Sequence, residues 1–474
     1  MSTGNFQRKC ILLLAGTAFL VLFAGLGIQE LGSGDETRVA GIAAEMFLEK
    51  EFLLPRLNGS PFLEYPPGYY WLTGAAFSLF GIHDFAAKLP SGLAAFGMVL
   101  LTYLFARKLK FSSREAFLSG IVLLFSGQFF AESRTCRVDM TLAFFLELSI
   151  FSFYAMIRSE RRSGKIGYWL LFLLGLVCGC YTKGLLGLVL PGSVIAFWLP
   201  AEDLSDRRFR WKRYVAACAG GLLAFGAAGI WYFLLLRREG YEMFHTAFWI
   251  NNLGRFTGNQ PDHAESFFYY LWKLPSLFQP WLLFLLLALA TGVQRIRNGR
   301  NRELLFPLLA LLIPFLLMCC ASGKRIVYLL PLSVPAALLT GWYLQQLLEM
   351  VQKRWQETHL KRIGKVVLFT AIAVLLILDF GVAFFRNRNE SLRPLFEKAA
   401  ELERQGKKLF LVNPPERTRG AAYFYLHRTI PEKTSEIPAP PPNECWIIRR
   451  KEETKDSTVY ADHHRLLEGR ASGS

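Results

Sequence analysis

The segment VVLFTAIAVLLILDFGVAFF, residues 366–385, contains a single charged residue, Asp379. A helix needs about 20 mainly apolar residues to cross the hydrocarbon core of a bilayer. Runs of this kind recur along the 474-residue chain, which is 53% hydrophobic and has a mean hydropathy of +0.28. Because a soluble protein of this length could not bury every such run, the sequence predicts a bundle of membrane-spanning helices.

The positive charge is distributed in a way that argues against a nucleic-acid partner. The chain carries a formal net charge of +17, but its Lys and Arg residues stand in short clusters between apolar runs. Such clusters are typical of cytoplasmic loops in membrane proteins. They occupy residues 8–9, 107–114, 158–165, 207–213, 295–302 and 353–365. We therefore expect these clusters on the cytoplasmic side and no nucleic acid among the partners.

Placing every basic cluster on one side determines the number of membrane crossings. Each pair of consecutive clusters must be joined by an outward and a returning segment, which predicts eleven spans with the N-terminus inside and the C-terminus outside. The predicted spans are residues 10–30, 85–105, 116–131, 139–157, 167–182, 185–200, 214–235, 273–293, 303–321, 326–347 and 366–385. The sequence thus predicts an all-α polytopic membrane protein with a transmembrane domain over residues 1–385.

Two long loops fall on the predicted outer side, at residues 31–84 and 237–272. Within the first, residues 36–50 show an amphipathic pattern, and residues 66–80 are aromatic and moderately apolar but too short to span. Tyr and Trp side chains suit the headgroup region of a bilayer. We expect both segments to be helices, with the second lying in the membrane interface.

The composition changes after residue 385, where the long apolar runs stop. Residues 392–405 have a polar helical pattern, whereas 408–412 and 445–448 are short apolar segments typical of strands. The sequence therefore predicts a small α/β domain over residues 386–474, outside the membrane.

Cationic residues from distant parts of the sequence fall on the predicted outer face. Lys183 lies in a turn between two spans, Lys324 and Arg325 follow the ninth span, and Arg134 precedes the fourth. Lysine and arginine at this depth can hold a phosphate group. The alternative is that they only extend toward lipid headgroups, as such residues at span ends usually do.

Carboxylates accompany these cations on the same face. Asp35 and Glu36 lie in the first outer loop, and Asp139 begins the fourth span. A carboxylate here can act as a general base or a metal ligand, although Asp-Glu also suits the start of a helix. Glu64 and His263 form an oxygen and nitrogen pair suited to a divalent cation. A lone His in an outer loop is otherwise more often solvated.

Several of these residues stand in motifs that resemble one known group of enzymes. The first outer loop contains GDETRVAGIAAE from residue 34, LPRLNG from residue 54 and EYPPGYYW from residue 64. Further matches are the stretch from Arg134 to Met140, TKG at 182–184, NLGRF at 252–256 and SGKRIVYLLP at 322–331. The ordered set resembles the lipid A 4-amino-4-deoxy-L-arabinose transferases and related protein mannosyltransferase-like enzymes of the GT-C superfamily.

The resemblance implies both a fold and a reaction. Members have a bundle of transmembrane helices, interfacial helices in the first outer loop and a periplasmic C-terminal domain. They move a sugar from a polyprenyl-phosphate donor to an acceptor on the outer, periplasmic face of the bacterial inner membrane. The resemblance implies catalytic roles for Asp35 and Asp139, and we add the neighbouring Glu36 as a third candidate.

The resemblance also implies a metal and a phosphate site. The expected metal is a divalent cation, seen as zinc in such enzymes, at Glu64 and His263. The candidates for binding the donor phosphate are Lys183, Lys324, Arg325, Tyr328, Arg134 and Tyr65. Tyr65 is a departure, because the family motif Glu-Lys-Pro-Pro has lysine at this position. Either Arg325 or Arg134 compensates for the missing lysine, or the donor headgroup differs.

The leading hypothesis is an inverting glycosyltransferase that moves a sugar from an undecaprenyl-phosphate donor to lipid A or a related envelope acceptor. A protein O-glycosyltransferase of the mannosyltransferase type is an alternative. A transporter of polyprenyl-linked sugars would need polar residues throughout the membrane depth and related halves, and a non-catalytic scaffold would not need the ordered set of polar residues. The gathering of these residues at one interface favours the enzyme.

Overall fold

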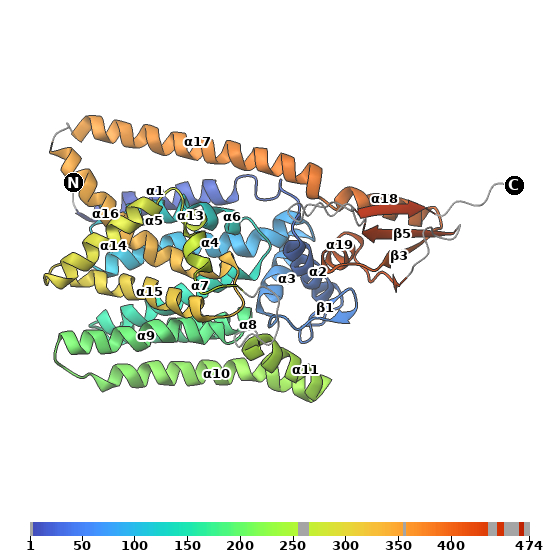
Figure 1. The fold of residues 1–474 in the computed structure, drawn as a ribbon, viewed down its shortest axis with the longest axis horizontal. Coiled ribbons are helices and arrows are strands. Elements are labelled where there is room, and N and C mark those ends of the chain that lie inside the picture. The colour runs from blue at the N-terminus through green and yellow to red at the C-terminus, as the bar shows by residue number, and fades with distance from the viewer. Residues whose placement is uncertain (1–2, 255–264, 354–356, 435–442, 450–463, 469–474) are drawn as a thin grey trace.

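Long apolar helices form the greater part of this computed structural model (Figure 1). The structure describes residues 3–254, 265–353, 357–434, 443–449 and 464–468. Within these residues, nine helices are long and apolar enough to cross a membrane, or ten if one bent pair forms a single span. The chain is therefore a multi-span membrane protein, as predicted.

The bundle is built from long helices joined by short helical pieces. The long helices are α1 (Thr3–Phe23), α4 (Asp84–Lys108), α7 (Val138–Arg158), α8 (Arg162–Lys183), α9 (Leu186–Ser205), α10 (Trp211–Glu239), α14 (Leu282–Arg297), α15 (Leu305–Cys320), α16 (Ser333–Gln352) and α17 (Glu357–Glu390). The shorter pieces are α5 (Ser113–Leu124), α6 (Gly127–Ser133), α11 (Tyr241–His245), η1 (Thr246–Gly254), α13 (Tyr269–Leu277), η2 (Arg302–Leu304) and η3 (Ile326–Leu332).

The structure does not confirm the predicted count of eleven spans. The span expected at 273–293 is divided between α13 and α14, and α14 has only 16 residues. The span expected at 116–131 is divided between α5 and α6, which are bent by 65°. The two breaks meet, because the amide of Gly127 donates a hydrogen bond of 2.9 Å to the carbonyl oxygen of Gln279. This tertiary contact satisfies backbone groups that a continuous helix would have satisfied itself.

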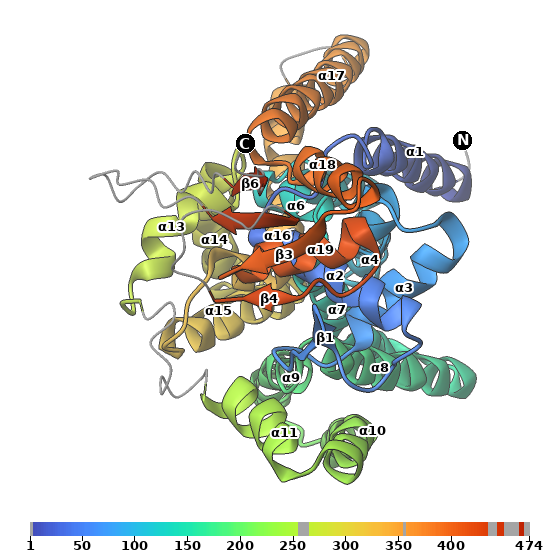
Figure 2. The ribbon, with the colours of Figure 1, turned by 90° about the vertical axis from the view of Figure 1, so that its right-hand side faces the viewer.

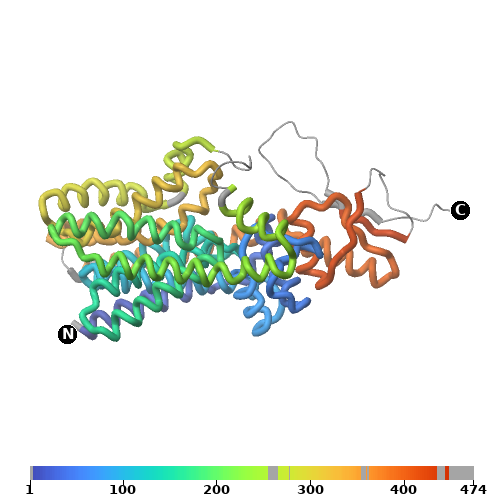
Figure 3. Tube along the Cα trace, turned by 90° about the horizontal axis from the view of Figure 1, so that it is seen from below, coloured from blue at the N-terminus to red at the C-terminus, as the bar shows by residue number. Residues whose placement is uncertain are grey.

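Residues from three of the six basic clusters predicted to be cytoplasmic lie together at one end of the bundle. Lys110, Arg158, Arg297 and Arg302, which follow or end different helices, line one cleft of about 480 Å³. Figures 1 and 3, two views at right angles, place the start of α1 at this end and the C-terminal strands at the opposite end. The end of the bundle with this cleft and the end that carries the first loop and the C-terminal domain therefore lie at opposite extremes of the long axis of the molecule.

Helix α17 lies beside the bundle and is largely separate from it. Figure 2 shows it at the edge of the bundle, with its axis outside the group formed by the other helices. Only 6% of the residues in its most apolar 18-residue stretch are buried by the rest of the chain. Its attachment includes an ion pair of 2.8 Å between Asp379 and Arg134.

The first loop contains two helices, α2 (Gly34–Leu48) and α3 (Gly68–Phe80), where helices were predicted. Between them, strands β1 (Arg56–Leu57) and β2 (Ser60–Pro61) form a hairpin. Its two loop residues, Asn58 and Gly59, both have positive φ (54° and 86°), as the Asn-Gly turn of a tight hairpin requires.

The C-terminal region forms the α/β fold that the sequence predicts. Its elements are α18 (Arg393–Arg404), β3 (Lys408–Val412), α19 (Glu416–Leu426), β4 (Glu432–Lys433), β5 (Glu444–Arg449) and β6 (His464–Glu468). The sheet order is β4-β3-β5-β6, with β3 parallel to both neighbours and β6 antiparallel to β5. Helix α19 shares one hydrophobic cluster with α2 and α3, so this region is packed against the first loop.

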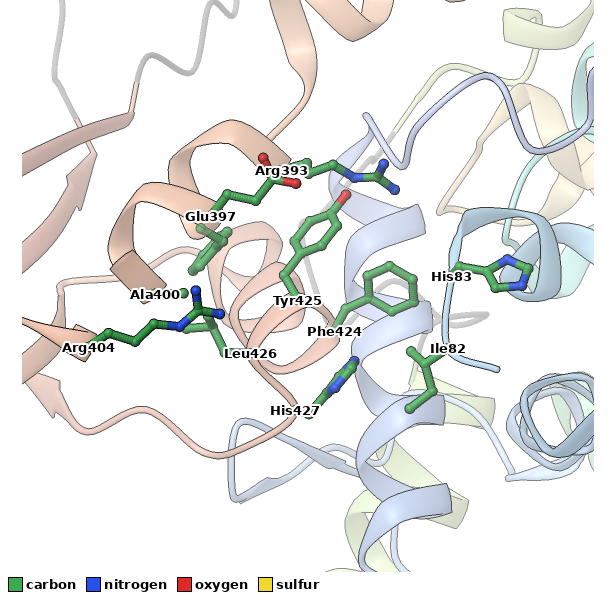
Figure 4. A pocket seen from close by; sticks show the side chains of 11 residues that line it. Ile82, His83, Arg393, Glu397, Ala400, Arg404, Phe424, Tyr425, Leu426 and His427 are labelled. Atoms are coloured by element: carbon green, nitrogen blue, oxygen red, sulfur yellow. The ribbon is translucent and has the colours of Figure 1, made fainter. Parts of the chain in front are cut away.

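A cavity of about 400 Å³ remains at the junction of the two regions. Figure 4 shows residues that line it, with Arg393 and Tyr425 from the C-terminal region on one side and Ile82 and His83, directly before α4, on the other. Arg393 forms ion pairs with Asp84 and Glu30, which tie α18 to the membrane bundle.

Candidate functional site

Five segments bring charged and aromatic side chains together at the end of the bundle that carries the first loop. They are the start of α2, the loop before α3, the start of α7, the end of α8 and the start of η3. The residues brought together are Asp35, Arg38, Glu64, Tyr65, Arg137, Asp139, Lys183, Arg325 and Tyr328. We call this set the polar cluster.

Three arginines converge on the carboxylate of Asp35. Arg38 Nη2 lies 3.1 Å from Asp35 Oδ1, Arg137 Nη2 lies 3.7 Å from Oδ2, and Arg325 forms a close ion pair with Oδ2. Burial alone would raise the pKa of Asp35, but the guanidinium groups of Arg325, Arg38 and Arg137 outweigh it and hold the pKa below its ordinary value of 3.8. Asp35 is therefore ionised at neutral pH.

The local sequence explains why Asp35 points into the cluster whereas Glu36 does not. Ser33 and Glu36 form a capping box at the start of α2, in which each side chain accepts a hydrogen bond from the backbone amide of the other residue. Glu36 also accepts from the amide of Cys136 at 3.3 Å and is fully buried 3.9 Å from Lys88. The structure therefore gives Glu36, predicted to be catalytic, the geometry of a structural cap.

A buried ion pair joins Lys183 to Asp139. Lys183 ends α8 and Asp139 lies in the first turn of α7, so each charge stands at the helix end that favours it. The two side chains are only 6% and 11% exposed. The Lys183 ammonium also lies 4.3 Å from the centre of the Tyr328 ring and 5.5 Å from that of Tyr65. Two aromatic faces thus stabilise the cation from other sides.

Tyr65 occupies the position where the family motif has lysine, and its environment keeps it neutral. The side chain is buried, and burial raises the pKa of its phenol above the ordinary value of 10.0, although the nearby Lys183 ammonium opposes this shift. A protonated phenol can donate one hydrogen bond but carries no charge. Tyr65 therefore adds no positive charge at this position, and the cations of the polar cluster are Arg38, Arg137, Lys183 and Arg325.

Two predicted phosphate-binding residues have partners outside the polar cluster. Arg134 donates to the carbonyl oxygens of Leu22 (3.0 Å) and Ala24 (2.8 Å) at the end of α1, and it pairs with Asp379 of α17. Lys324 donates to the carbonyl oxygens of Ala321 and Glu265. Both cations therefore close helix ends or hold segments together.

Of the two predicted metal ligands, Glu64 and His263, the structure describes Glu64. His263 lies outside the described residues. Glu64 belongs to the polar cluster, where its Oε2 lies 3.0 Å from Arg38 Nη2. Within the part of the chain that the structure describes, no group of three or more His, Cys, Asp and Glu side chains is arranged to hold a metal.

The sequence places Arg38 and Arg137 on the predicted outer face but indicates no role for them, and it does not indicate Glu416 at all. Arg38 lies three residues after Asp35, a spacing that places the two side chains on one helix face. Arg137 is the N-cap residue of α7, two positions before Asp139. Glu416 pairs with Arg38 at 2.7 Å from a position 378 residues away, and no local pattern could have indicated it.

Comparison of the sequence with known proteins identifies its relatives. The family model described as dolichyl-phosphate-mannose-protein mannosyltransferase matches residues 12–241. The undecaprenyl phosphate-α-4-amino-4-deoxy-L-arabinose arabinosyl transferase of Edwardsiella ictaluri is 31% identical over 66% of this chain, which spans 55% of the length of that relative. An uncharacterized protein of Aquifex aeolicus is 27% identical over 98% of this chain and 97% of its own length.

Solved structures support the same relationship at the level of the fold. The crystal structure of ArnT from Cupriavidus metallidurans bound to undecaprenyl phosphate aligns with a TM-score of 0.73, at 20% identity, over 92% of this chain and 87% of that one. The sequence motifs, the relatives and the fold agree. The chain therefore belongs to the GT-C superfamily, in the group formed by aminoarabinose transferase-like and protein mannosyltransferase-like glycosyltransferases.

Proposed function

We propose that this protein is an inverting glycosyltransferase that moves a sugar from an undecaprenyl-phosphate donor to lipid A or a related glycolipid. The observation that carries the proposal is the polar cluster, in which an ionised Asp35 pairs with Arg325 and Arg137 and which also contains the buried Lys183–Asp139 pair. Family membership and the arabinosyl transferases among the relatives support the donor class.

The cations of the cluster suit a reaction in which negative charge develops on a leaving phosphate. The acceptor oxygen attacks the anomeric carbon while the bond from that carbon to the phosphate oxygen breaks, and the electron pair stays with the lipid phosphate. Arg325 and Lys183 are donors already held in place, so their stabilisation of the developing charge costs little reorganisation. Attack opposite the leaving group inverts the anomeric configuration.

Asp35 has two possible tasks, which depend on the acceptor. With a hydroxyl acceptor, its carboxylate takes the proton as the new bond forms. With a phosphate acceptor, as on lipid A, no proton needs to be removed, and Asp35 orients the acceptor through its arginines. The low pKa of Asp35, which Arg325, Arg38 and Arg137 maintain against burial, makes it a weak base and favours the second task.

The metal remains part of the proposal. Carboxylate and imidazole are suitable donors for a divalent cation such as zinc, and the carboxylate of Glu64 belongs to the polar cluster. Such an ion at Glu64 and His263 would add positive charge beside the leaving phosphate. Arg38 shares the Glu64 carboxylate, so the site would be held by a charge network as well as by its ligands.

An apolar cleft beside the cluster fits the lipid chain of the donor. It has a volume of about 270 Å³ and is lined mainly by Leu, Phe and Ala side chains, half of them from α10 and the others from α9, the residue before it, α11 and η1. Gly184, which directly follows Lys183, also lines it. A phosphate near Lys183 would therefore have an apolar surface next to it for the first isoprene units.

In this proposal the cluster faces the periplasm, and the protein lies in the bacterial inner membrane. The test uses purified protein in liposomes with undecaprenyl-phosphate sugars labelled in the sugar, and follows the label into lipid A and protein fractions. Wild type should transfer label and Asp35→Asn should not, whereas Glu397→Gln, on the exposed surface of α18, should behave as wild type. Transfer unaffected by Asp35→Asn would overturn the site, and label in protein would change the acceptor.

A further inference from the structure

The C-terminal region reaches the polar cluster through the contact between α19 and α2. The two helices cross at Gly41 and Gly420, where a Cβ on either residue would overlap the backbone of the other helix. The hydroxyl of Thr37 donates a hydrogen bond of 3.0 Å to the carbonyl oxygen of Arg417 in this crossing. Because backbone packs against backbone, the first residues of α19 are held close to the first turns of α2.

This crossing brings Glu416 to Arg38. Arg38 Nη1 donates to Glu416 Oε2 at 2.7 Å. Its other terminal nitrogen, Nη2, lies 3.1 Å from Asp35 Oδ1 and 3.0 Å from Glu64 Oε2. The guanidinium is planar and rigid, so fixing one nitrogen fixes the direction of the other. Glu416 therefore helps to determine how Arg38 bridges the two carboxylates of the site.

The burial of these groups makes the arrangement specific. The side chains of Arg38, Asp35 and Glu64 are 11%, 21% and 13% exposed, whereas that of Glu416 is 51% exposed. Arg38 also lies over the ring of Phe62, 5.2 Å from its centre. An arginine enclosed in this way has few alternative positions, and the exposed Glu416 is the contact that the C-terminal region supplies.

We propose that Glu416 is a positioning residue for sugar transfer, and that the C-terminal domain is thereby a working part of the site. Glu416 holds the Arg38 guanidinium in the orientation that bridges Asp35 and Glu64, and it does not touch the substrate itself. This inference rests on the proposed function and extends it to the C-terminal domain.

The effect of losing Glu416 should appear in turnover. Without this anchor, the enclosed Arg38 guanidinium is no longer directed at both Asp35 and Glu64, so one of the three arginine contacts that orient Asp35 is weakened. Misplacement of a reacting group costs on the order of ten- to a hundredfold in rate. Glu416→Ala should therefore lower kcat by roughly that factor and leave KM for the donor nearly unchanged, and Glu416→Gln, which keeps an acceptor oxygen, should recover part of the loss.

Glu432 provides a matched control in the same domain. It also joins the C-terminal region to the first loop, because Asn58 Nδ2 donates to Glu432 Oε1 at 2.9 Å, and it pairs with Arg419. Neither contact involves the polar cluster. Glu432→Ala should weaken the docking of the domain to a similar extent but leave kcat unchanged.

The experiment measures kcat and KM of full-length wild type, Glu416→Ala, Glu416→Gln and Glu432→Ala in liposomes, with apparent Tm as the measure of folding. A loss of kcat confined to the Glu416 variants, with partial recovery in Glu416→Gln, supports the inference. Equal losses in Glu432→Ala would reduce Glu416 to a docking contact, and full activity in Glu416→Ala would overturn the inference while leaving the proposed function intact. No transfer by wild type would overturn both.

Discussion

Lys183 forms a buried ion pair with Asp139, and this pair is proposed to contribute both to stability and to sugar transfer. Replacing Lys183 by methionine, alone and together with a replacement of Asp139, distinguishes these two roles. The pair is only 6% and 11% exposed, so Lys183→Met leaves a buried carboxylate without its partner. Removing one member of a buried ion pair typically costs about 3–5 kcal/mol. We therefore expect a fall of several degrees in apparent Tm for the purified protein in detergent.

The double variant Lys183→Met/Asp139→Leu replaces the whole pair by apolar side chains. Replacement of both partners is often neutral or stabilising by about 1–4 kcal/mol, so the double variant should regain the Tm of wild type. It should not regain transfer, because the cation proposed to face the donor phosphate is still missing. Loss of such a donor typically costs about 10²–10³ in kcat.

Thermal unfolding followed by intrinsic fluorescence, together with the liposome transfer assay, measures both quantities on the same preparations. If Lys183→Met melts at the temperature of wild type, the buried pair does not contribute as its burial indicates. If the double variant recovers transfer, Lys183 has a structural role only. Either result would refute the reasoning.

The remaining predictions concern the carboxylate, the domain crossing, α17 and the apolar cleft. Burial raises the pKa of Asp35, but Arg325, Arg38 and Arg137 outweigh it and hold the pKa below 3.8. The contribution of the Asp35 carboxylate to stability is therefore present above pH 3.8 and is lost as the pH falls through the lower pKa of the folded protein. The Tm difference between wild type and Asp35→Asn should narrow in acid, and a constant difference would contradict this. Gly420→Ala should lower the stability of the folded protein by about 1–3 kcal/mol, because its Cβ would overlap the backbone of α2. The control Gly226→Ala has open space around it and should leave the stability unchanged or raise it by up to about 1 kcal/mol. Equal Tm values for the two variants would refute the close crossing of α19 and α2. Arg134→Met leaves Asp379 unpaired and should lower Tm without changing KM for the donor; a raised KM would place Arg134 at the phosphate instead. Gly229→Leu, which fills the cleft, should raise KM for a long-chain donor but not for a donor with a short isoprenoid chain, and Gly226→Leu, whose site is also open but outside the cleft, should change neither.

The membrane bundle could be predicted from sequence because its signal is local. A run of apolar residues long enough to span indicates a helix without knowledge of its neighbours. The breaks at Gly127 and Gln279 are joined by a hydrogen bond between segments that are distant in the chain, and no local pattern indicates this contact. The predicted count of eleven is therefore not confirmed at the two places where an apolar run is divided between two helices.

The polar cluster could be predicted in outline but not in its pairings. Asp35 and Glu36 are adjacent carboxylates, and the capping box with Ser33, the amide of Cys136 and Lys88 together hold Glu36 away from the polar cluster. Arg134 and Arg137 are three positions apart, yet the chain turns between them, so that one reaches α1 and α17 and the other reaches Asp35.

The contact between Glu416 and Arg38 could not be predicted from any local pattern in the sequence. It depends on the crossing of α19 over α2, which two glycines permit by allowing the backbones to touch. Neither glycine has a positive φ or a turn around it that would attract notice in the sequence. A contact between residues so distant in the chain becomes visible only when the domain is seen docked on the first loop.

The central claim is that the sugar moves while the phosphate stays with its lipid. A donor labelled with ¹⁴C in the sugar and ³²P in the phosphate tests this directly in liposomes that contain the purified protein and lipid A. We predict that ¹⁴C appears in the acceptor in step with ³²P-labelled undecaprenyl phosphate, and that Asp35→Asn stops both. If ³²P follows ¹⁴C into the acceptor, or if both labels cross the bilayer on an intact donor, the protein is not a glycosyltransferase of this kind.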